Sequence, residues 1–103
     1  MLILASVADG ERHGYAIRRD VAGRTGGEVR LGSATLYRLL SQLLEDGLVE
    51  ESDRRPAPEL DDERRRYYRV TPAGRRALAA ELRRLDRVLA AARVSRRSAS
   101  QRA

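Results

Sequence analysis

The stretch from Ser33 to Val49 limits what this chain can fold into more than any other part of it. A polar leading edge opens the stretch, and Gly47 near its end leads into strand-forming residues. Residues three and four apart share one face of a helix, so a leucine stripe at that spacing must face a core. The stripe consists of Leu36, Leu40, Leu43 and Leu44. We therefore predict a helix with Ser33 as its N-cap that closes at Asp46 and Gly47.

Two further helices are predicted ahead of this one. The apolar opening from Met1 to Ala8 predicts a short helix that Asp9 and Gly10 end. A second helix is predicted from His13 to about Arg24, stopped by Thr25, Gly26 and Gly27, because paired glycines supply the left-handed geometry of helix ends. Residues 28–31 then read as extended, with room for a short strand. Two helices joined by a glycine-containing connector are the order of a helix-turn-helix.

A β-hairpin and a long helix are predicted after the third helix. Residues 48–50 and 65–71 have strand character and flank a polar segment rich in proline and acids, residues 53–63. Strand alternation places Tyr68 inward with Val70, and Tyr67 outward. Thr71 followed by Pro72 is a strong helix start. We predict a mainly α chain with a small β-hairpin: a winged helix-turn-helix over 1–71, a helix over 72–95 and a disordered tail over 96–103.

The last helix carries an apolar seam that predicts a dimer. Its members recur at alternating steps of four and three, which is the spacing of a coiled coil. They are Leu78, Leu82, Leu85, Leu89 and Ala92. A core built without Trp or Phe is modest, so support from a second copy of the chain is expected.

Composition narrows the classes of function. The 103 residues allow one core, and 21 arginines, with no lysine, give a formal net charge of +6, which suits a polyanionic partner, although basic proteins also bind membranes or RNA. Without cysteine and with one histidine, we expect no disulfide, no metal site and no cofactor. No constellation for catalysis can be assembled, so an enzyme is disfavoured. The apolar opening is too short to span a bilayer, and we expect a cytoplasmic protein.

Several polar residues are candidates for contact with DNA. Arg38 is the best candidate for a base edge, because its planar fork matches the two acceptors of guanine. Ser33 and Thr35 are expected to bond phosphates, and Tyr37 either contacts DNA or packs. Gln42 completes the outward side of the third helix, whose alternative interpretation is an ordinary amphipathic helix that meets only water. Tyr15, at the start of the second helix, is a candidate phosphate clamp.

Three arginines before the second hairpin strand are further candidates. Arg64, Arg65 and Arg66 are placed where a wing reaches the minor groove or the DNA backbone. Asp61, Asp62 and Glu63 stand beside them, and simple pairing with these acids is an equally good interpretation. The acidic segment is also poorly suited to phosphate.

The ordered motifs of the chain resemble those of the PadR family of transcriptional regulators. The motifs are His-Gly-Tyr at 13–15, Gly-Ser-Ala-Thr-Leu-Tyr at 32–37, Glu-Asp-Gly-Leu-Val at 45–49 and Arg-Tyr-Tyr-Arg-Val-Thr at 66–71, followed by Gly74. The resemblance covers nearly the whole chain. It implies a winged-helix homodimer, usually a repressor, that joins through its terminal helix and binds an inverted-repeat operator in double-stranded DNA. It also associates Tyr15, Thr35 and Tyr37 with DNA contact.

The resemblance leaves two points open. Some relatives bind flat aromatic effectors between paired tryptophans, and this chain has no tryptophan, so a small-molecule effector stays of unknown identity. A winged-helix module that binds protein and not DNA is the alternative function from another class. The prediction is a sequence-specific DNA-binding regulator.

Overall fold

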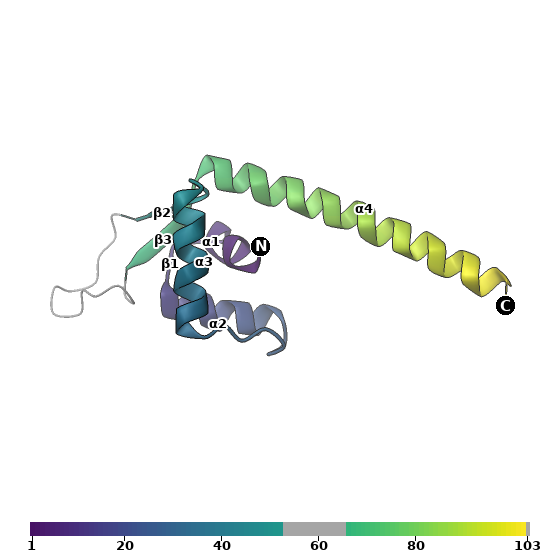
Figure 1. The fold of residues 1–103 in the computed structure, drawn as a ribbon, viewed down its shortest axis with the longest axis horizontal. Coiled ribbons are helices and arrows are strands. Elements are labelled where there is room, and N and C mark those ends of the chain that lie inside the picture. The colour runs from purple at the N-terminus through teal and green to yellow at the C-terminus, as the bar shows by residue number, and fades with distance from the viewer. Residues whose placement is uncertain (53–65, 103) are drawn as a thin grey trace.

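The computed structural model of the chain describes residues 1–52 and 66–102, with side chains through residue 94. Three short helices and a small sheet form a head, from which a long helix extends (Figure 1). In chain order the elements are α1 (Leu2–Ala8), β1 (Arg12–His13), α2 (Gly14–Arg24), α3 (Ser33–Glu45), β2 (Val49–Glu51), β3 (Tyr67–Val70) and α4 (Pro72–Arg102).

The sheet is antiparallel, with β3 in the centre. Its strand order is β1-β3-β2, and Val49 lies opposite Val70 while Arg12 lies opposite Tyr68. The hairpin of β2 and β3 confirms the sequence prediction, and Tyr68 is buried as expected. The strand considered at residues 28–31 is absent. The third strand of the sheet is β1 instead. Its two residues pair with residues of β3 that lie more than fifty positions further along the chain.

The core lies between α1, α2, α3 and the sheet. Its residues are almost fully buried: Ile3, Leu4, Val7, Ile17, Val21, Leu36, Leu40, Val49 and Tyr68. These are aliphatic residues apart from the tyrosine. The core therefore fits one domain of modest size.

Local interactions set the ends of α2. His13 is the N-cap, and its Nδ1 accepts a hydrogen bond of 3.1 Å from the Ala16 amide. At the other end Gly26 and Gly27 have φ values of 60° and 84°, the left-handed region that glycine adopts without a steric cost. The chain reverses there and enters the connector to α3.

The third helix forms nearly where the sequence places it. It begins at Ser33, but Gly32 is the N-cap, so the expectation that Ser33 caps the helix is wrong. Leu36 and Leu40 are buried and Leu43 is half-buried, whereas Leu44 is 37% exposed and lies at the edge of the stripe. Gly47, with a φ of 72°, ends the helix and turns the chain into β2.

The fourth helix begins as predicted. The hydroxyl of Thr71 accepts a bond of 3.0 Å from the Gly74 amide and donates one of 2.6 Å to the Gly47 carbonyl oxygen. Ala77 and Leu78 pack against the core, and beyond them α4 leaves the head (Figure 1). The helix continues to Arg102, so the disordered tail expected over 96–103 is replaced by helix over 96–102.

Candidate nucleic-acid interface

The outward face of α3 presents a row of polar side chains. Thr35, Arg38 and Gln42 are exposed and follow one another at steps of three and four, so they share one side of the helix. Leu36 and Leu40 hold the opposite side in the core. The row is therefore displayed on a helix that cannot rotate about its own axis without exposing the core.

Gln42 already has a partner at the C-terminal end of α3. Its Nε2 donates a hydrogen bond of 3.1 Å to Oδ1 of Asp46, one turn further along. This acid and Glu45 make the C-terminal end of α3 less favourable to phosphate than its N-terminal end. Thr35 and Arg38 lie nearer the favourable end.

Arg18 fixes the start of α3 from the neighbouring helix. Its Nε donates a bond of 2.8 Å to the Leu31 carbonyl oxygen, and its Nη1 donates one of 3.1 Å to Oγ of Ser33. The side chain thereby joins α2 to the residues that open α3. Sequence reasoning did not find this role, because the bonds span 13 and 15 residues and no local pattern signals them.

Tyr37 is half-buried between α3 and the start of α2. Its ring lies so close to Gly14 that a Cβ at that glycine would overlap the phenol oxygen. The close approach explains why glycine follows the cap of α2. The tyrosine thus packs, which was one of its two predicted roles, and its contact with DNA stays a prediction.

Tyr15 projects from the first turn of α2. It is 58% exposed, its ring stacks on His13 with centroids 6.4 Å apart, and the Arg19 guanidinium carbon lies 5.8 Å from its centroid. A cation over the face of a tyrosine is held by the quadrupole of the ring. The side chain expected as a phosphate clamp is therefore accessible and has an arginine beside it.

Arg66, just before β3, and Arg69, within β3, are paired with acids. Arg66 lies 3.4 Å from Glu51, and Arg69 lies 2.7 Å from Glu50 and 3.8 Å from Glu11. Of the three arginines predicted here, Arg64 and Arg65 fall outside the described residues. Arg66 pairs with Glu51. The acids at 61–63, which the sequence offers as its partners, also lie outside the described residues.

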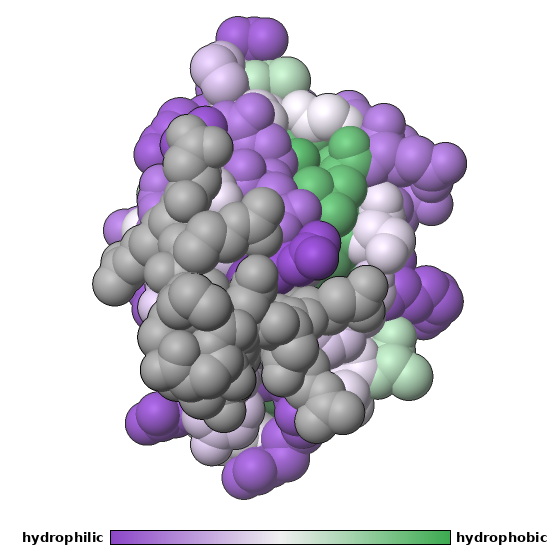
Figure 2. All heavy atoms as spheres, turned by 90° about the vertical axis from the view of Figure 1, so that its left-hand side faces the viewer, coloured by the Kyte–Doolittle hydropathy of each residue, from purple (hydrophilic) through white to green (hydrophobic). Residues whose placement is uncertain are grey.

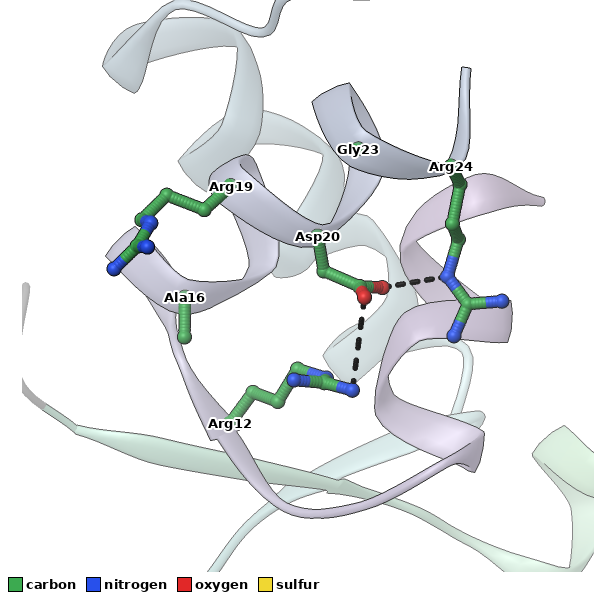
Figure 3. A pocket seen from close by; sticks show the side chains of 6 residues that line it. All are labelled: Arg12, Ala16, Arg19, Asp20, Gly23 and Arg24. Carbon is green, nitrogen blue, oxygen red and sulfur yellow. Dashed lines mark hydrogen bonds and ion pairs between the residues drawn. The ribbon is translucent and has the colours of Figure 1, made fainter. Parts of the chain in front are cut away.

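A second ion network ties α1, β1 and α2 together. Asp20 lies 2.6 Å from Arg24 and 3.6 Å from Arg12 (Figure 3). Arg24 also pairs with Asp9. Burial raises the pKa of Asp20, but the hydrogen bond from Arg24 and the charges of Arg12 and Arg24 outweigh it and leave the pKa below its ordinary value. Figure 3 shows Arg19 turned away from this carboxylate.

The seam of α4 is exposed along most of its length. Leu82 and Leu89 are each 48% exposed and Ala92 is exposed, whereas Leu78 is half-buried against the head and Leu85 is half-buried. Val88 and Val94 add to the exposed apolar surface. A row of half-exposed leucines on a projecting helix is typical of a surface that meets another protein chain.

The side of the molecule that carries the wing strands β2 and β3 is mostly polar. Outside the grey residues of Figure 2, hydrophilic side chains dominate this face, and a small hydrophobic patch lies in its upper part. Among the residues that the structure describes, no helix is long and apolar enough to cross a membrane. A helix-turn-helix packed on a three-stranded antiparallel sheet defines a winged-helix protein, as the sequence predicted.

Comparison with known proteins places this winged helix in a family. The chain belongs to the transcriptional regulator PadR-like family, whose model matches residues 3–80. Transcriptional regulator Rv3488 of Mycobacterium tuberculosis is 39% identical over 84 residues, which cover 82% of this chain and 72% of that protein. The resemblance drawn from the sequence motifs is confirmed.

Solved structures share the fold. A transcriptional regulator from Clostridium thermocellum matches with a TM-score of 0.72 at 23% identity, over 84% of this chain and 81% of that one. Bacillus subtilis PadR in complex with operator DNA matches with a TM-score of 0.67 at 22% identity, over 79% of this chain and 44% of that one. The chain is thus a transcriptional regulator of the PadR-like family with a winged-helix fold.

Proposed function

We propose that this regulator binds double-stranded DNA in a sequence-specific manner and inserts the outward face of α3 into the major groove. One observation carries the proposal: Thr35, Arg38 and Gln42 share an exposed face of a helix that the core holds fixed from the other side. Side chains of these types bond phosphates and base edges. The structure of Bacillus subtilis PadR in complex with operator DNA supports the binding of DNA by this chain.

Each side chain has a proposed task. Arg38 reads a guanine through its two acceptors. Thr35 and Ser33 bond phosphates at the start of the helix, where the helix dipole favours negative charge. Gln42 adds a polar contact further along the groove after exchange of its bond to Asp46.

The same proposal includes a homodimer joined through α4. The seam of Leu78, Leu82, Leu85, Leu89 and Ala92 buries its exposed leucines against the seam of a second copy. A two-fold dimer presents two α3 helices about 34 Å apart, one turn of DNA, and so selects an inverted repeat. A dimer seated on its operator excludes other proteins from that duplex, and repression is the simplest outcome.

Selection from a random pool of duplexes by the purified chain tests the proposal. We expect enrichment of an inverted repeat whose half-sites are centred about one helical turn apart. Absence of enrichment would refute DNA recognition. Stable capture of a protein partner by a chain that ignores duplex DNA would instead favour the alternative of a protein-binding module.

A substitution of Arg38 tests the reading residue itself. Arg38→Ala should reduce discrimination at one base pair of the selected site by about 1 to 3 kcal/mol, because a bidentate contact is lost. Arg87→Ala, an exposed arginine of α4, is the charge-matched control and should keep full discrimination. Competition binding with duplexes mutated at single positions measures the difference. If the two variants discriminate equally between the mutated duplexes, Arg38 does not read a base pair.

A further inference from the structure

The eight arginines of the head within residues 1–52 and 66–70 fall into two groups according to their partners. Four of them face carboxylates: Arg12, Arg24, Arg66 and Arg69. The other four form no ion pair with an acid among residues 1–52 and 66–94: Arg18, Arg19, Arg30 and Arg38. All four of the second group lie on α2, on α3 or on the connector between them.

Three members of the second group meet in one groove. The α2–α3 groove is an open hollow of about 160 Å³ lined by Tyr15, Arg18, Arg19, Ala22, Arg30 and Leu31. It contains three positive charges and a phenol and no acidic side chain. Such a lining is suited to an anion with several acceptor oxygens.

Each of the three arginines that line the groove is positioned by a separate contact. Arg18 is anchored on Leu31 and Ser33, and Arg19 is held over the ring of Tyr15. Nη2 of Arg30 would lie 3.1 Å from a Cβ at Gly27, so the bare glycine provides space for this guanidinium. Three separate contacts therefore bring the arginines to the same hollow.

We propose that the α2–α3 groove binds a backbone phosphate of the DNA duplex beside the recognition helix. The inference rests on the proposed function, and it assigns Arg19 and Arg30 to the interface in addition to Tyr15. Arg18 joins the groove to Ser33 at the start of α3. A phosphate bound in the groove would therefore set how deeply α3 enters the major groove and at which base pairs it lies. The paired Arg66 and Arg69 contribute less, because their charge is already met by Glu50 and Glu51.

The expected signature is a loss of affinity without a loss of discrimination. A phosphate contact releases about 0.9 counterion, so its removal weakens binding about eightfold at 100 mM salt, whatever the sequence. It also makes the slope of log K against log salt less steep by about 1. A contact to a base edge would instead change the preference between sequences.

Fluorescence anisotropy with the selected duplex and a scrambled duplex tests the inference from 50 to 200 mM KCl. The double variant Arg19→Ala and Arg30→Ala should weaken both complexes about eightfold at 100 mM and lower the salt slope by about 1, because both arginines hold the same phosphate. Each single variant should show part of this loss. Arg19→Lys and Arg30→Lys should restore most of the slope, because they keep the charge. Arg87→Ala is the matched control on α4 and should behave as the wild type.

Three results would overturn the inference, and they are distinguishable. If the wild-type chain binds the selected duplex and the variants at 19 and 30 match Arg87→Ala, the groove does not bind phosphate, and the proposed function stands. If the wild-type chain binds neither duplex, the proposed function fails and the groove assignment fails with it. Loss of discrimination without a change in salt slope would also count against a phosphate role.

Discussion

Asp20 is one carboxylate that joins three elements of the head. It pairs with Arg24 of its own helix and Arg12 of β1, and Arg24 continues the network to Asp9 after α1. The pKa of Asp20 is lowered in the folded chain, so folding favours the ionised form. The stabilisation is fully present above the ordinary aspartate pKa of about 3.9 and is lost as the pH falls through the lower folded value.

Asp20→Asn should therefore reduce the free energy of unfolding by about 1 kcal/mol at pH 7, because charged hydrogen bonds are lost. The difference from the wild type should shrink as the pH falls below about 3.9. Urea denaturation at pH 7 and at decreasing acidic pH measures both quantities. Asp86→Asn, at an exposed carboxylate of α4, is the control. A constant difference across this range would contradict the role given to Asp20.

Gly74 determines how α4 joins the sheet. A Cβ at this position would overlap the Leu48 carbonyl oxygen and lie 2.7 Å from Cγ2 of Val70. The first turn of α4 therefore packs directly on the backbone that leads into β2. Thr71 fixes the same turn through its bonds to Gly47 and Gly74.

We predict that Gly74→Ala lowers the free energy of unfolding by about 1 to 3 kcal/mol, since overpacking forces the turn away from the sheet. Gly23→Ala is a matched change in a helix, at a position where a Cβ meets nothing within 4 Å. It should leave stability unchanged or raise it by up to about 1 kcal/mol, because alanine favours helix. Thermal or urea unfolding compares the two variants. Equal effects would show that the close approach at Gly74 is unimportant.

The elements show which features the sequence could predict. Leucine spacing, the Thr71-Pro72 start and the glycines at 26, 27 and 47 are local signals, and they placed α2, α3, the hairpin and the start of α4. The strand β1 was missed because two residues carry no periodicity and pair only with distant Tyr67 and Tyr68. The leucine stripe of α3 predicts which side of the helix is buried, and therefore which polar side chains are exposed on the other side. The bonds of Arg18 and the α2–α3 groove depend on tertiary contacts, which no local pattern signals.

At the scale of the whole molecule, α4 projects from the head with its apolar seam uncovered (Figure 1). A helix of this kind does not stabilise the head beyond its first turns, where Ala77 and Leu78 pack. We therefore expect two copies to join along the seam, with the heads left free to meet DNA.

The double variant Leu82→Asp and Leu89→Asp should sediment as one chain of 11.5 kDa, whereas the wild type should sediment as a dimer. Two buried carboxylates in the seam carry a large desolvation penalty. Circular dichroism should show that the head keeps its helices. The control is Arg83→Asp with Arg87→Asp, which adds acids away from the seam and should remain dimeric. A wild-type chain that sediments as a monomer would refute this interface.

The most direct measurement of the central claim is a hydroxyl-radical footprint of the wild-type chain on its selected duplex. The account predicts two protected segments related by the symmetry of the inverted repeat, with centres about 10 base pairs apart, one for each α3 of the dimer. A single protected segment without a symmetric counterpart, or uniform cleavage at saturating protein, would contradict it.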